Sequence, residues 1–155
     1  MPNGPTHQLL GALSGAAAAH HYVSPCLSPV DSEAGTPLLI VGGLVAGGFG
    51  GRLPDLLDPP IQPNHRAFFH SIVLGAAVAG AAVFTVKKLR LLSGSPLKDK
   101  RSGARSTTGG DETVPSTSIS LDQALLFALV LALLVSVLSH LGADSGTPKG
   151  LPILG

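Results

Sequence analysis

Histidine and aspartate residues that could bind a metal ion are gathered in three short parts of this sequence. They are His7 near the start, the segment LPDLLDPPIQPNHRAFFHS at 53–71, and the segment SHLGADSG at 139–146. Imidazole nitrogens and carboxylate oxygens are the usual ligands of zinc and similar ions, and a catalytic site keeps one coordination position open for water. These side chains predict a divalent metal site, with zinc the expected ion. Its predicted ligands are His7, Asp55, His65, His70, His140 and Asp144.

The spacing of these residues limits how they can share a site. His140 and Asp144 are four apart, so they share one face if a helix continues through Gly142. If the helix ends at that glycine, they line its last turn instead. His65 and His70 are five apart, which places them about 140° from each other on a continuous helix. We therefore expect His65 just before a helix or in its first turn, and His70 within it.

Asp55, Asp58 and Arg66 are the candidate catalytic residues. The two aspartates are three apart and flanked by prolines, which favours a stiff turn that fixes where the carboxylates point. Either carboxylate could act as a general base, and Arg66 could bind a phosphate or carboxylate group with two hydrogen bonds. Ser71 and Thr147 are expected to support the ligands or to cap helices.

Four apolar stretches must position these residues: 7–23, 38–51, 67–86 and 123–143. A spanning helix needs about 20 apolar residues. The third and fourth stretches reach that length, and the first two reach it only if their ends lie in the interface or pack against protein. The fourth stretch carries Leu, Val and Ala around its whole circumference, unlike a surface helix. The sequence predicts an all-α membrane bundle of about four helices in a single domain, 1–155, with a soluble bundle as the alternative.

The composition agrees with a membrane protein whose partner is the lipid bilayer. The chain of 155 residues is 45% hydrophobic and only 12% charged, and its mean hydropathy is +0.42. A net charge of +1 gives no reason to expect a nucleic-acid partner, which usually needs a clustered basic face. Cys26 is the single cysteine, so an intrachain disulfide and a cysteine-rich zinc site are excluded. No cleavable signal peptide is expected.

A basic segment, 87–120, separates the third and fourth stretches and is predicted to be a flexible loop. It holds most of the lysine and arginine in the chain. The positive-inside rule places it in the cytoplasm, which makes the protein a multi-pass protein of the cytoplasmic (inner) membrane. Loop 24–37 would then also be inside. Threading the chain through the bilayer brings nearly all candidate ligands to the opposite face, whereas His20 and His21 lie at the other end and are left out of the site.

The motifs THQLLG, LPDLLDP, HRAFFHS and SHLGADSGTPKGLPILG follow one another along nearly the whole chain. In this order they resemble the YdjM-like family, membrane-associated proteins described as metal-dependent hydrolases. The family is regarded as distantly similar to zinc-dependent phospholipase C and P1-type nucleases, which implies phosphoester hydrolysis by analogy alone. The family motifs fall on His7, Leu53-Pro54-Asp55 with Asp58, His65-Arg66 with His70-Ser71, and His140, Asp144, Thr147-Pro148 and Gly150.

One departure from the family pattern concerns Asp58. Many relatives carry the second aspartate two positions after the first, whereas here it follows three positions after Asp55. Whether Asp58 binds the ion directly or supports a ligand is therefore left open.

The resulting hypothesis is a membrane-bound metal-dependent hydrolase that acts on phosphoester or lipid-like substrates at the membrane surface. The alternatives are a non-catalytic metal-binding protein, a transport-type small membrane protein, and a family member that keeps the fold without activity. A transport path should place ionisable groups along the middle of the spans. In this sequence they sit at the ends of the spans, which favours a surface site.

Overall fold

The computed structural model describes residues 4–57, 71–94 and 118–145, and helices account for nearly all of them. In chain order they are α1 (Gly4–Ala18), the π-helical turn η1 (Ala19–Val23), the 3₁₀ turn η2 (Ser24–Cys26), α2 (Pro29–Gly50), α3 (Leu53–Leu57), α4 (Ile72–Leu92) and α5 (Leu121–Ser145). The prediction of an all-α bundle of about four apolar helices is confirmed. Within these described ranges, an isolated bridge between Leu27 and Ile119 is the sole β-type pairing.

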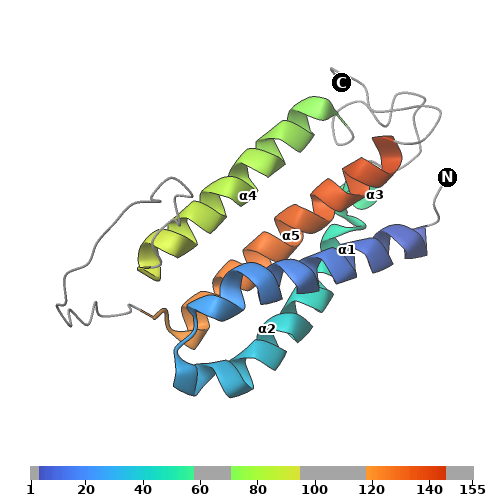
Figure 1. The fold of residues 1–155 in the computed structure, drawn as a ribbon. Coiled ribbons are helices and arrows are strands. Elements are labelled where there is room, and N and C mark those ends of the chain that lie inside the picture. Colours follow the sequence, from blue (N-terminus) through green and yellow to red (C-terminus); the bar gives the residue numbers. More distant parts are fainter. Residues whose placement is uncertain (1–3, 58–70, 95–117, 146–155) are drawn as a thin grey trace, which may run out of the picture.

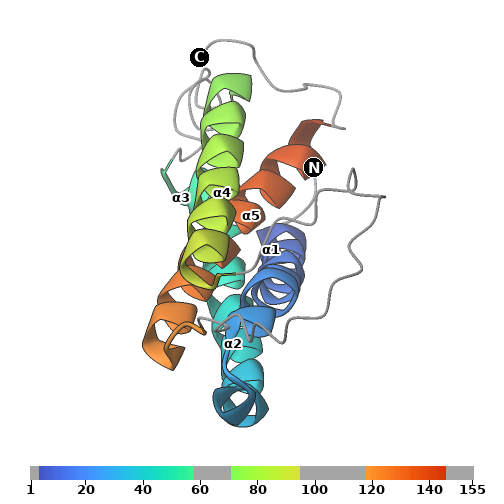
Figure 2. The ribbon, with the colours of Figure 1, turned by 60° about the vertical axis from the view of Figure 1, so that its left-hand side comes forward.

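The bundle consists of a three-helix core and one helix beside it. α1, α2 and α5 pack against one another, and α4 lies along α5 (Figure 1). The turned view also shows α4 against α5 (Figure 2). The start of α1, the ends of α2 and α5, and the start of α4 lie together at what we call the His7 end. The end of α4 and the start of α5 lie at the opposite end, which we call the Lys87 end.

Glycines bring α1 and α2 into backbone contact. The contact glycines recur at four-residue intervals on α1 and along α2 as far as its C-cap: Gly11, Gly15, Gly43, Gly47 and Gly51. A Cβ atom on Gly11 would collide with the carbonyl oxygen of Gly47, and one on Gly51 would collide with the carbonyl oxygen of His7. Lipid tails are as apolar as leucine, so helices in a membrane associate through close packing of this kind. The glycines therefore set the position of His7 relative to the end of α2.

A stripe of small residues on α5 faces α1 and α2. The small residues are buried and spaced four apart, and two site residues continue the same spacing. In order they are Ala124, Ala128, Ala132 and Ser136, followed by His140 and Asp144. Ser136 lies so close to Gly50 that a Cβ atom on the glycine would collide with its hydroxyl. Across the α1–α5 contact, the hydroxyl oxygens of Ser14 and Ser139 are 3.1 Å apart. The periodicity that packs α5 therefore also carries His140 and Asp144 into the interior.

Three segments are long and apolar enough to cross a membrane: Pro29–Leu57, Ile72–Leu92 and Leu121–Ser145. α1 has 15 residues, which gives it a length of about 22 Å, shorter than the roughly 30 Å hydrocarbon core of a bilayer. It instead packs on α2 and α5. α4 exposes Val83, Phe84 and Leu91 by 55–79%. Such a surface suits lipid and not water, which argues against the soluble alternative.

The prediction of a loop at 24–37 is wrong, because α2 begins at Pro29. Ser28 caps the helix, and its hydroxyl accepts a hydrogen bond of 3.1 Å from the Asp31 backbone N–H. Pro29 occupies the first turn, where its missing N–H removes no helical hydrogen bond. Pro37, directly before the predicted start, stands inside the helix and removes one backbone hydrogen bond there.

The start of the third apolar helix also differs from its prediction. α4 begins at Ile72 and not at residue 67, with Ser71 as its N-cap. The Ser71 hydroxyl accepts a hydrogen bond of 3.2 Å from the backbone N–H of Leu74. The capping role expected of Ser71 is therefore confirmed. His70, predicted to lie within this helix, falls outside the described residues.

The predicted loop 87–120 begins too early, because α4 continues to Leu92. Lys87, Lys88 and Arg90 therefore sit on the last turns of a helix. Lysine and arginine are good helix formers, and positive charge is favourable near a helix C-terminus. Gly94, with φ of 60°, follows the helix in the left-handed conformation common after helix ends. The segment 95–117 of the predicted loop lies outside the described residues.

Candidate metal centre

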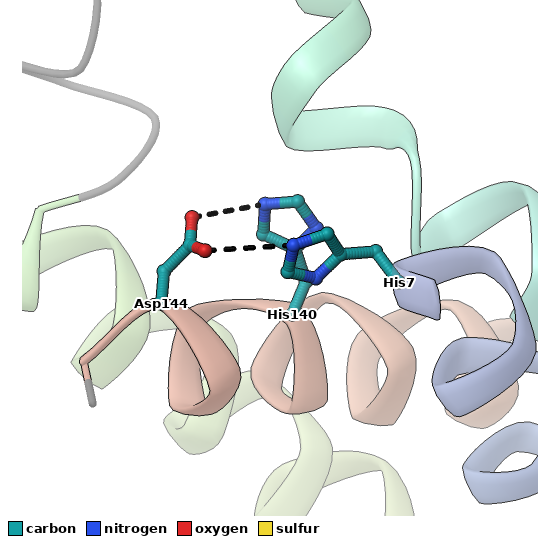
Figure 3. A group of neighbouring side chains, drawn as sticks. All are labelled: His7, His140 and Asp144. Atoms are coloured by element: carbon teal, nitrogen blue, oxygen red, sulfur yellow. Dashed lines mark ion pairs between the residues drawn. The ribbon is translucent and has the colours of Figure 1, made fainter. Parts of the chain in front are cut away.

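Four of the predicted site residues meet at the His7 end of the bundle. His7 comes from the first turn of α1, Asp55 from α3, and His140 and Asp144 from the last turns of α5. Figure 3 shows the two imidazole rings beside each other, with Asp144 reaching both of them. The ring centroids are 4.1 Å apart. The other predicted residues lie outside the described part of the chain and stay predictions: Asp58, His65, Arg66 and His70.

The Asp144 carboxylate connects the two histidines. Its Oδ1 atom is 3.5 Å from Nε2 of His7, and its Oδ2 atom is 3.5 Å from Nε2 of His140. One candidate ligand atom from each of the three residues lies within 4.8 Å of the others. All three residues are buried, with exposed fractions of 3% or less. Because α5 continues through Gly142, His140 and Asp144 share one face, as the helical alternative predicted.

The backbone of Gly51 orients His140. Nδ1 of the imidazole is 2.8 Å from the Gly51 carbonyl oxygen. A carbonyl can only accept a hydrogen bond, so Nδ1 is the donor and the lone pair of the neutral ring is at Nε2. Metal-binding histidines commonly have such a partner on the second nitrogen. Gly51 also packs against the backbone of His7, so this one residue positions both histidines.

Asp55 lies at the exposed edge of the cluster. Its Oδ1 atom is 3.5 Å from Nε2 of His140, and its side chain is 47% exposed. The stiff turn predicted around this residue is instead the short helix α3, with Pro54 in its first turn. Proline is tolerated there because the first N–H groups of a helix have no partner within it. Asp55 thus links the buried residues to the surface.

A pocket of about 480 Å³ lies beside Asp55. Arg52 and Gln8 supply its other polar side chains, and Val45 and Phe49 belong to its apolar wall. Arg52 was not among the predicted site residues, although it is the one lysine or arginine among residues 1–65 and precedes Asp55 by three positions. Gln8 and Gly51 were not predicted either. Their roles follow from packing between helices, for which the sequence offered no comparable signal.

The surroundings of Asp144 favour a nearby positive charge. Asp144 is buried, and it is the next-to-last residue of α5, where the helix dipole is negative. A buried carboxylate at that position is costly unless a cation neutralises it. A protonated histidine or a bound metal ion can supply that charge.

The fold and this cluster define a small helical membrane protein with a buried His–Asp centre at one end of its bundle. The chain belongs to the YdjM inner membrane protein family, whose family model matches residues 1–155. It is accordingly an inner membrane protein with three helices able to cross the bilayer. Among curated proteins and solved structures, no significant match was found. The family description gives a location and no reaction.

Proposed function

We propose that this protein is a membrane-bound metal-dependent hydrolase, in which His7, His140 and Asp144 hold a divalent ion. Zinc is the expected ion. The observation that carries the proposal is a pair of imidazole–carboxylate contacts of 3.5 Å inside a buried cluster. Residues from the first and last helices of the bundle form this cluster.

The contact distances suit ligands around a common ion. Ligand atoms about 2.0–2.1 Å from a tetrahedral zinc ion lie roughly 3.3 Å from one another. A direct hydrogen bond between an imidazolium and a carboxylate is shorter, about 2.7–2.9 Å. The 3.5 Å contacts are therefore closer to a ligand–ligand spacing than to a hydrogen-bond length. His65 and His70 remain predicted as further ligands.

Each described residue has a distinct role in the proposed reaction. When bound, the ion would make a water molecule nucleophilic near neutral pH and polarise the bond to be cleaved. Asp144 supplies negative charge for cation binding, and the Gly51 carbonyl holds the His140 ring in its ligand tautomer. Asp55, whose carboxylate lies at the exposed edge of the cluster, would accept the proton of the attacking water. Asp58, the other predicted base, lies outside the described residues.

The pocket beside Asp55 favours an amphiphilic substrate with an anionic group. The Arg52 guanidinium can bind a phosphate with two parallel hydrogen bonds. Val45 and Phe49 on the outer face of α2 provide an apolar wall for an acyl chain or a similar group. Arg66 is a second predicted anion ligand. The analogy with zinc-dependent phospholipase C and P1-type nucleases makes phosphoesters the first substrate class to test.

The test is metal analysis of the purified protein and of an Asp144→Asn variant. The wild-type protein should bind close to one zinc ion per chain, whereas the variant should retain less than about a tenth as much, because an amide is a far weaker ligand. Asp122→Asn, at the other end of the same helix, is the matched control and should keep its zinc. Hydrolysis of chromogenic phosphoesters should follow the metal content. Equal zinc in the wild-type and Asp144→Asn proteins would refute the proposal.

A structural ion is the second candidate, and the burial of His7, His140 and Asp144 favours it. An ion there would tie α1 to α5 without turning over any substrate. A structural site is fully coordinated, whereas a catalytic site keeps an open position. Chelation should lower the unfolding temperature whether the ion is structural or catalytic. Only a catalytic ion should give a metal-dependent activity that chelation removes and zinc restores.

A further inference from the structure

A second cavity lies toward the Lys87 end of the bundle, away from the metal centre. It is a groove of about 870 Å³ where α4 packs on α5. Val83 and Val86 of α4 and Leu131 and Val135 of α5 belong to its apolar lining. The volume falls within the roughly 300–1,000 Å³ typical of small-molecule sites.

The charged residues that line the groove are all basic. Lys87 and Arg90, three residues apart on α4, project to the same side of the helix. Tyr22 of η1 contributes to the lining and is 39% exposed. Tyrosine is enriched where a membrane protein meets the membrane surface. The groove thus has a polar, positively charged part and an apolar part.

The groove, from its basic part to its apolar end, extends along α4 for most of the depth of one lipid leaflet. From Arg90 to Ala82, α4 rises about 12 Å, compared with roughly 15 Å for half of a bilayer's hydrocarbon core. Ala82 and Leu89 are the buried residues of α4, and more than half of its other residues are exposed to the surroundings. In a bilayer those surroundings are acyl chains.

We propose that this groove binds one anionic glycerophospholipid from the leaflet at the Lys87 end. Lys87 and Arg90 contact the phosphate, and an acyl chain lies against Val86, Leu131 and Val135. The commitment to an anionic lipid rests on charge complementarity, since basic pockets between membrane helices are suited to such headgroups. The site is separate from the metal centre, and the proposal does not depend on the hydrolase function.

Native mass spectrometry of the full-length protein in detergent tests the site, with phosphatidylglycerol and phosphatidylcholine as the probes. The wild-type protein should retain phosphatidylglycerol in preference to phosphatidylcholine. The double variant Lys87→Gln/Arg90→Gln should bind phosphatidylglycerol about 30-fold more weakly, because it lacks two of the charges that attract an anionic headgroup. Lys88→Gln is the matched control, since Lys88 is exposed, neighbours Lys87 and does not line the groove.

A second variant tests the apolar part of the groove. Val86→Trp should fill it and displace phosphatidylglycerol while both basic residues remain. Circular dichroism and gel filtration check that each variant folds. Equal retention of the two lipids would overturn the proposal. So would an equal effect of Lys88→Gln and the double variant on phosphatidylglycerol binding, or unchanged lipid binding in Val86→Trp. Dimer formation that excludes lipid would also overturn it, because a second chain would then occupy the groove.

Discussion

Asp55 and Asp144 both reach His140 Nε2 at 3.5 Å, but they differ in exposure. Asp144 is buried between two imidazoles, whereas Asp55 is half exposed beside the pocket. In the proposed function, this difference in exposure distinguishes the metal ligand, Asp144, from the general base, Asp55. We expect Asp55→Asn to keep most of its zinc and to lower kcat of phosphoester hydrolysis about 10²- to 10⁴-fold, the usual contribution of a general base.

Zinc content and kcat of Asp55→Asn should be measured beside those of Asp144→Asn, which should lose both. Glu33→Gln, an exposed acid near the start of α2 and therefore at the other end of that helix from the site, serves as the control and should behave as the wild type. If Asp55→Asn loses as much zinc as Asp144→Asn, Asp55 belongs among the ligands, as the sequence also allowed. The assignment of the base would then be wrong.

At the scale of the helices, the contact between α1 and α2 positions the candidate metal centre. Gly51 has no room for a side chain, because its Cβ atom would collide with the His7 carbonyl oxygen. We expect Gly51→Ala to destabilise the protein by about 1–3 kcal/mol, as overpacking does, and to weaken zinc binding roughly 10-fold by moving the partner of His140 Nδ1. Thermal unfolding and zinc titration measure the two effects.

Gly48→Ala is the control for this prediction. A Cβ atom on Gly48 makes only ordinary contacts of 3.6 Å or more, so stability and zinc binding should stay close to wild type. Similar behaviour of the two alanine variants would show that the glycine contact does not position the site.

The helices show how far the sequence alone could predict this structure. Long apolar runs predicted the helices correctly, because a membrane-facing helix must be apolar on nearly all sides. Helix ends were less predictable, since the caps at Ser28 and Ser71 depend on single local hydrogen bonds. In the site, the four-residue spacing of His140 and Asp144 was readable in advance. The Gly51 carbonyl and the Arg52 pocket were not, because both arise from contact between helices.

For the whole molecule, the distribution of charge predicts its orientation in the membrane. Three of the four lysines and arginines that the structure describes, Lys87, Lys88 and Arg90, lie on the last turns of α4. In the sequence, Lys98, Lys100, Arg101 and Arg105 follow them. From the positive-inside rule, we expect the Lys87 end to face the cytoplasm and the candidate metal centre to face the other side.

Cysteine labelling tests this orientation. In a Cys26→Ser background, Leu57→Cys places an exposed thiol at the metal-centre end, and Lys88→Cys places one at the Lys87 end. A membrane-impermeant maleimide added to spheroplasts should label Leu57→Cys at once and Lys88→Cys only after the membrane is permeabilised. The Cys26→Ser protein is the unlabelled control. The reverse pattern would place the metal centre in the cytoplasm, and a hydrolase there would act on substrates of the inner leaflet or the cell interior.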